Sequence, residues 1–182
     1  MGFDDTRHAL AWEGVINHVH GKRVPFDLTE YEERVRSGSC FICDLVAGAP
    51  GSEHEILLDD GTHIAFLGRY PTMYGHVLVA PKLHLEHVVR DFEQGGYLRL
   101  QAVVYRVARA VEAVVPSERT YLLSLGSQQG NAHVHWHISP LPPGTPYESQ
   151  QFHALMAENG VIPWSPAQAA ELAAQLRAEL GS

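Results

Sequence analysis

Three histidines alternate with apolar residues in the segment His133-Val134-His135-Trp136-His137. Side chains two positions apart on a strand point to the same side, so this spacing predicts three imidazoles on one surface. Imidazole can act as a nucleophile and as a metal ligand. Three interpretations follow: a polar strand without a special role, a catalytic metal site of three histidines with an open water position, and nucleophilic attack on phosphorus.

The chain has two cysteines, Cys40 and Cys43, in a Cys-x-x-Cys pattern. In a reducing compartment this spacing is typical of metal or redox chemistry more than of a structural disulfide. A buried apolar pair and a redox dithiol are alternatives, but the surrounding sequence lacks the βαβ pattern of thioredoxin-like proteins. Zinc fits the pair better, because zinc is commonly bound by thiolates and imidazoles.

The charge balance bears on which partners the protein binds. Among 182 residues there are 13 Lys plus Arg against 21 Asp plus Glu, a net charge of -8. This balance argues against polymeric nucleic acid and anionic membranes as partners, because both would be repelled. A small phosphorylated ligand remains compatible, because backbone N–H groups and a few histidines can hold one or two phosphates. The N-terminus has no signal-peptide pattern, and no apolar run approaches the roughly 18 residues that span a bilayer, so we expect a cytoplasmic protein.

The elements that would position these residues follow from hydrophobic periodicity. Residues 94 to about 115 have apolar residues at the helical period and predict one long helix. Short β-type runs are separated by turn signals such as Asp59-Asp60-Gly61. We therefore predict an α+β fold, an antiparallel sheet of about five strands with the long helix packed on it. The predicted strands are 55–58, 62–67, 75–80, 121–125 and 132–139.

The chain divides into three predicted parts around one core domain. Residues 1–39 form an N-terminal extension with one short helix over 29–36, which Gly38 ends. Residues 40–145 form the catalytic domain. Residues 146–182 form a C-terminal tail in which Ser165-Pro166 caps and opens a helix to about Leu180.

Further motifs join the histidine segment in one order along the chain. Gly75-His76-Val77-Leu78-Val79 and Pro81-Lys82-Leu83-His84 precede the long helix, and the histidine segment follows it. Over roughly residues 40 to 140 this combination resembles the histidine triad (HIT) family. The resemblance implies a HIT-like fold, a homodimer whose sheets join, and cleavage of a nucleoside phosphate bond at the α-phosphorus. Arg69-Tyr70-Pro71 is similar to the branch of the family that handles diadenosine polyphosphates.

The resemblance also assigns roles to individual residues. His135, the middle histidine, would attack phosphorus and form a nucleotidyl-histidine, and His137 would face the phosphate oxygens or the leaving group. Gln129 and Asn131 would donate amide hydrogen bonds to the substrate, although a polar hairpin loop is an alternative account of both. Phe66, which opens a turn, is also assigned to substrate binding.

Some family members pair a Cys-x-x-Cys with two histidines of these motifs. Here the equivalent residues are Cys40, Cys43, His84 and His133, which would form a closed tetrahedral structural zinc site without a catalytic water. The expected protein is a hydrolase that cleaves nucleoside phosphoramidates or dinucleoside polyphosphates, with a small nucleotide as its substrate. The alternatives are a nucleotidyltransferase or phosphorylase of diadenosine polyphosphates, and a non-catalytic nucleotide-binding dimer.

Overall fold

One antiparallel sheet organises the computed structural model, which describes residues 21–181. In the described part of the chain the sheet has five strands in the order β1-β2-β3-β5-β4. All neighbouring strands pair antiparallel. The predicted α+β fold is confirmed. The strands are β1 (Ile56–Asp59), β2 (His63–Leu67), β3 (Val77–Pro81), β4 (Arg119–Leu123) and β5 (Trp136–Leu141).

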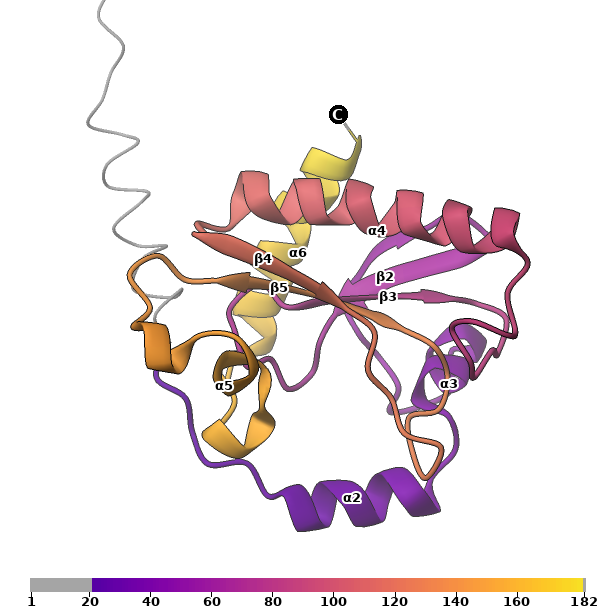
Figure 1. The fold of residues 1–182 in the computed structure, drawn as a ribbon, viewed down its shortest axis with the longest axis horizontal. Helices are drawn as coiled ribbons and strands as arrows, with labels where there is room; N and C mark the ends of the chain where they lie inside the picture. The colour runs from indigo at the N-terminus through magenta and orange to yellow at the C-terminus, as the bar shows by residue number, and fades with distance from the viewer. Residues whose placement is uncertain (1–20, 182) are drawn as a thin grey trace, which may run out of the picture.

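Helices lie on both sides of this sheet (Figure 1). The long helix α4 and the C-terminal helix α6 lie on one side, and α2 and α3 lie on the other. The predicted helices correspond to α2, α4 and α6, whereas the short helix α3 was not predicted. The helices are α2 (Leu28–Ser37), α3 (Phe41–Ala47), α4 (Gln94–Val114), α5 (Phe152–Leu155) and α6 (Pro166–Gly181), with 3-10 turns η1 (Tyr147–Ser149) and η2 (Ala157–Asn159).

The strands β2 and β3 are buried on both faces, which explains their continuous apolar sequences. Alternate side chains feed two separate cores because successive strand residues point to opposite faces. Leu57, Ala65, Leu67, Val77, Val79 and Ile138 pack with α4 and α6. Ile64, Phe66, Leu78 and Ala80 pack with Ile42 and Leu45 of α3.

The C-terminal helix α6 completes the first core. Leu172 and Leu176 are buried against it, and burying each leucine contributes roughly 1.5 to 3 kcal/mol. Arg106 of α4 donates to the carbonyl of Leu180 at 2.7 Å, and Arg177 donates to the carbonyl of Ile56 at 2.8 Å. Residues predicted as a tail therefore belong to the same packed unit as the sheet.

The length and polarity of a helix decide whether it can cross a bilayer. Within residues 21–181, each helix is too short or too polar to cross a bilayer.

Candidate active site and metal-ligand cluster

The histidine segment runs into β5 from a loop. β5 begins only at Trp136, so the prediction that His133 and His135 lie on the strand is wrong. Hydrogen bonds to other segments replace strand pairing in this stretch: the Val134 N–H donates to the Leu85 carbonyl at 2.6 Å, and the Ser124 hydroxyl donates to the His135 carbonyl at 2.8 Å. The prediction of a shared surface holds, because all three histidine side chains line one cavity of about 1060 Å³.

His135 lies at this cavity with one ring nitrogen already engaged. Its Nδ1 is 2.7 Å from the carbonyl oxygen of His133. A carbonyl only accepts, so Nδ1 carries the proton and donates, which leaves the lone pair on Nε2. Burial lowers the pKa of His135, and the hydrogen bond to His133 partly opposes this shift. The ring is therefore neutral at pH 7, with Phe41 packed edge-on against it at a centroid distance of 5.8 Å.

A second histidine pair lies beside His135. His137 Nδ1 is 3.0 Å from His76 Nε2, and the two rings are stacked with centroids 5.2 Å apart. Burial lowers the pKa of His76 to about 4 and, with the nearby His76 and His135, lowers that of His137 to about 2. Both rings are neutral near pH 7, so one donates a hydrogen bond to the other.

His76 is a site residue that sequence reasoning did not assign a role. It immediately precedes the fully buried strand β3 and is itself buried. A histidine next to such an apolar run was the available signal, since buried polar groups need partners. Its Nδ1 and the hydroxyl of Ser139 are buried without a hydrogen-bond partner within the described residues, and both side chains line the cavity. Both atoms are themselves enclosed, so they lie behind the cavity surface.

The loop before the histidine segment brings two predicted amides to the cavity. Gln129 and Asn131 both line it. Gln129 accepts a hydrogen bond from Arg36 at 2.9 Å, and the Asn131 amide donates to the Tyr31 hydroxyl at 2.9 Å. Asn131 has a φ of 58°, a conformation that asparagine adopts more readily than most residues.

Phe66 does not reach the cavity, which corrects its assignment to substrate binding. It is 0% exposed, because the alternation of β2 points it into the core beneath α3. Its ring lies against Phe41 and His54, at centroid distances of 6.3 and 5.0 Å, and both of these residues line the cavity. Phe66 therefore supports the cavity wall from behind.

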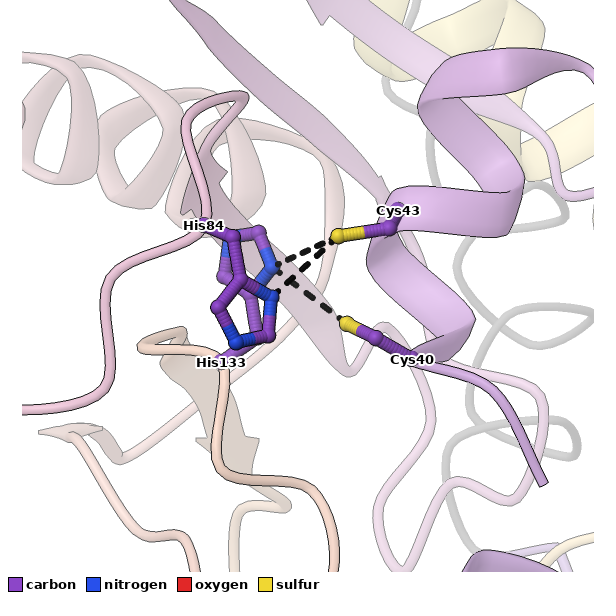
Figure 2. Close-up of side chains that lie close together, drawn as sticks. All are labelled: Cys40, Cys43, His84 and His133. Carbon is purple, nitrogen blue, oxygen red and sulfur yellow. Dashed lines mark hydrogen bonds between the residues drawn. The ribbon is translucent and has the colours of Figure 1, made fainter.

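Cys40, Cys43, His84 and His133 converge on one point, as Figure 2 shows. The cysteines come from the start of α3, His84 from the loop after β3 and His133 from the loop before β5. Their donor atoms all lie within 4.8 Å of one another. The Cys40 Sγ–His133 Nδ1, Cys43 Sγ–His84 Nδ1 and Cys43 Sγ–His133 Nδ1 distances are 3.4, 3.2 and 3.6 Å.

These separations match a tetrahedral metal site. Zinc–sulfur bonds of about 2.3 Å and zinc–nitrogen bonds of about 2.0 Å place sulfur and nitrogen roughly 3.5 Å apart. The opposite nitrogens are held from outside: His133 Nε2 lies 2.9 Å from the Pro81 carbonyl, and His84 Nε2 lies 3.2 Å from the Glu86 carboxylate. Each Nδ1 lone pair is thereby turned toward the sulfurs. The donor set fits zinc.

Near neutral pH the Cys43 sulfur needs a nearby cation in order to be a thiolate. Burial raises the pKa of Cys43 to about 11, with the neighbouring Cys40 adding to the shift. Both cysteines are free thiols in the structure. A bound divalent cation would reverse this shift, because a coordinating thiol is deprotonated.

The fold and this pair of sites define a class of protein. The HIT domain model matches residues 50–143, and a HIT-like protein of Mycoplasma genitalium, itself uncharacterized, is 31% identical over 115 residues, covering 60% of this chain and 77% of the relative. An uncharacterized HIT-like protein of Mycobacterium tuberculosis is 30% identical over 105 residues, covering 56% of this chain and 70% of the relative. The chain belongs to the HIT family, whose proteins are of the nucleotide-binding and hydrolase type.

Solved structures agree on the fold. A hypothetical histidine triad nucleotide-binding protein from Sulfolobus tokodaii superposes with a TM-score of 0.63 at 22% identity, covering 78% of this chain and 92% of that one. A zinc-bound histidine triad family protein from Mycobacterium smegmatis gives 0.61 at 24% identity, covering 79% and 94%.

Proposed function

We propose that this protein is a nucleotide-binding hydrolase that cleaves nucleoside phosphoramidates or dinucleoside polyphosphates at the α-phosphorus through a nucleotidyl-His135. The observation that carries the proposal is the state of the His135 ring. Its Nδ1 is committed to the carbonyl of His133 at 2.7 Å, so Nε2 has the free lone pair. Because burial lowers its pKa, the ring is a neutral nucleophile at pH 7 without a separate base.

The reaction has two displacements at one phosphorus. In the first, Nε2 of His135 forms a bond to the α-phosphorus, while the bond from phosphorus to the leaving group breaks and its electron pair departs with that group, which takes a proton from solvent when it leaves as an amine. In the second, water attacks the same phosphorus, the phosphorus–nitrogen bond breaks, and a proton from the water passes to solvent. His135 returns to its neutral state with Nδ1 still protonated, and the nucleotide is released.

Neighbouring groups stabilise the charge that develops on phosphorus and on the leaving group. His137, with its ring centroid 4.9 Å from that of His135, would orient the attacking ring and face the phosphate oxygens or the leaving group. Gln129 and Asn131 would supply amide donors from the loop that borders the cavity. Such fixed dipoles act most strongly where water is excluded.

We also propose that Cys40, Cys43, His84 and His133 hold one structural zinc ion. The four donor positions leave none for a catalytic water, so the ion would supply a cross-link and no chemistry. The cross-link ties α3 to the loops after β3 and before β5. The zinc-bound relative from Mycobacterium smegmatis supports the assignment.

The test of the central step is the His135→Ala variant. It should lower turnover of adenosine phosphoramidate or a dinucleoside polyphosphate by at least about 10³-fold, since the lost nucleophile acts in the transition state. Nucleotide affinity should stay nearly unchanged. Rapid quench of the wild-type enzyme with labelled substrate, followed by mass analysis, should show a nucleotidyl adduct on His135.

Three results would redirect the proposal. Turnover that survives His135→Ala would eliminate the nucleotidyl-histidine mechanism. Product formation that depends on added inorganic phosphate would identify a phosphorylase or transferase, because the second displacement then uses phosphate in place of water. A protein that binds nucleotides but turns over neither substrate would be a binding module.

A further inference from the structure

Helix α2 borders the active-site cavity on the side opposite the sheet. Figure 1 shows it apart from the sheet, with the loop between β4 and β5 reaching toward it. Leu28, Tyr31 and Val35 follow the i, i+3, i+7 spacing of one helix face, and all three line the cavity. None of the α2 residues is buried. The apolar face of this helix therefore looks into the cavity instead of into a packed core.

Aromatic rings and a guanidinium gather where α2 meets the loop after β2. The Phe26–Tyr31, Phe26–Tyr70 and Tyr31–Tyr70 ring centroids are 5.3, 5.0 and 5.9 Å apart. The Arg34 guanidinium lies 5.4 Å from the centroids of both tyrosines. Arg34 is exposed and has no carboxylate partner among the residues that the structure describes. We call Phe26, Tyr31, Arg34 and Tyr70 the α2 cluster.

The α2 cluster is connected to the loop that leads into the histidine segment. The Tyr31 hydroxyl accepts from Asn131 at 2.9 Å, and Arg36 donates to Gln129 at 2.9 Å. A side chain at Gly130 would collide with Val35, which shows how closely the loop approaches the helix. The helix and the catalytic loop thus form two walls of one cavity, fixed to each other at three positions.

The cavity is larger than a single small ligand needs. At about 1060 Å³ it lies at the upper end of the range for small-molecule sites, roughly 300 to 1000 Å³. Its lining has the guanidiniums of Arg34, Arg36 and Arg69 against the carboxylates of Asp44 and Glu158, although the whole chain has a net charge of -8. Arg69 is occupied by the carbonyls of Gly51 and Glu53, and Arg36 pairs with Glu32. Among the described arginines that line the cavity, Arg34 is the one left for a ligand.

We propose that the α2 cluster is a leaving-group subsite that accepts the second nucleoside of a dinucleoside polyphosphate. Tyr70, the more exposed of the two tyrosines, stacks on the second base, Tyr31 supports that ring edge-on, and Arg34 pairs with the phosphate chain between the two nucleosides. Aromatic faces stack on any base, and guanidinium matches the geometry of phosphate oxygens. The inference rests on the proposed function and narrows it, because a phosphoramidate with a small leaving group would leave this subsite empty.

The experiment compares two substrates that differ only in the leaving group. The ratio of kcat/KM for diadenosine tetraphosphate to kcat/KM for adenosine phosphoramidate is measured in the wild type, Arg34→Ala and Tyr70→Leu. Arg34→Ala should lower the ratio about tenfold or more, because a charge-assisted hydrogen bond is lost. Tyr70→Leu should lower it about fivefold or more through lost stacking. The matched control is Glu33→Ala, an exposed α2 residue outside the cavity lining, which should leave the ratio unchanged.

A binding measurement separates this inference from the proposed function. In the His135→Ala background, Arg34→Ala should weaken diadenosine tetraphosphate binding at least about tenfold more than it weakens AMP binding. Suppose that Arg34→Ala and Tyr70→Leu leave both the kcat/KM ratio and the affinity for diadenosine tetraphosphate relative to AMP unchanged. The α2 cluster is then not a leaving-group subsite, and the histidine mechanism is unaffected by that result. If turnover survives His135→Ala, the mechanism fails, and the binding comparison still decides the subsite.

Discussion

Two groups of imidazoles meet at the histidine segment, one through His133 and the other through His135 and His137, and the first group and His135 offer opposite ring nitrogens. His84 and His133 turn Nε2 outward to Glu86 and to the Pro81 carbonyl and present Nδ1 to the two sulfurs. His135 commits Nδ1 to the His133 carbonyl, which leaves Nε2 for chemistry. The hydrogen bond at one nitrogen therefore decides the task of the other. All of these residues are histidines, so residue type alone does not distinguish the two tasks.

The surroundings of the two groups also differ in the charge they can accept. The first group includes two cysteines, and Cys43, whose pKa is raised to about 11, is a thiol near neutral pH without a bound cation. The second group consists of buried neutral rings: burial lowers the pKa of His135, and it lowers those of His76 and His137 to about 4 and about 2 from the ordinary value near 6.5. The first is suited to hold a cation, and the second is suited to attack an electrophile.

The largest effect is expected from removing one metal ligand of the first group. His84→Ala should abolish the roughly one equivalent of zinc per chain and lower the free energy of unfolding by more than about 3 kcal/mol, because loss of a bound metal is among the largest single-residue effects. His87→Ala, a histidine of the same loop outside the cluster, is the matched control. Elemental analysis and denaturant titration measure both effects.

The opposite result for His84→Ala would reassign the cluster. Unchanged metal content and stability in His84→Ala would show that the four side chains do not form a structural zinc site. Loss of turnover on chelation, with the melting temperature unchanged, would show that the metal is catalytic.

The second group is tested by His137→Asn. Turnover should fall by about 10²-fold, less than for His135→Ala, because His137 stabilises developing charge but forms no covalent bond to phosphorus. His153→Asn removes an exposed histidine outside this cavity and should leave turnover unchanged. Steady-state kinetics at fixed pH provides the comparison. A loss as large as that of His135→Ala, with the adduct found on His137, would exchange the two roles.

Sequence alone was sufficient where a local pattern carries the structure. Helical periodicity predicted α4, and turn signals separated β1, β2 and β3, because these patterns arise from burial on one face or both. Prediction from sequence failed where contacts between distant residues determine the local structure. The start of β5 depends on Leu85 and Ser124 holding the histidine segment off the strand, and the burial of Phe66 depends on α3, a seven-residue helix too short for a clear period.

The residues of the candidate site were likewise predicted only in part. The resemblance to the HIT family implied that Cys40, Cys43, His84 and His133 meet, and their donor atoms do converge. His76 was missed as a partner of His137 because their contact joins residues 61 positions apart in the chain. The approach of α2 to the cavity was missed for a similar reason, since its contacts with residues 129 to 131 span about a hundred positions.

The smallest expected effect concerns acid stability and distinguishes the buried rings of the second group from exposed histidines. The folded protein holds the pKa of His76 at about 4 and that of His137 at about 2, whereas both are near 6.5 in the unfolded chain. Between these values the unfolded state binds more protons than the folded state, so stability rises with pH and is lost as pH falls below about 6.5. Each group should contribute a slope of at most about 1.4 kcal/mol per pH unit.

Metal ligands also titrate in acid, so the informative quantity is the difference in slope between the wild type and His76→Gln. The slope is measured by denaturant titration from pH 7 to about pH 4.5. His76→Gln should flatten the slope, because one of the two titrating rings is gone, while His153→Gln, at an exposed position, should leave it unchanged. Equal slopes for the wild type and His76→Gln would mean that His76 is not held neutral by burial, and the contrast drawn between the two imidazole groups would then rest on the His135 hydrogen bond alone.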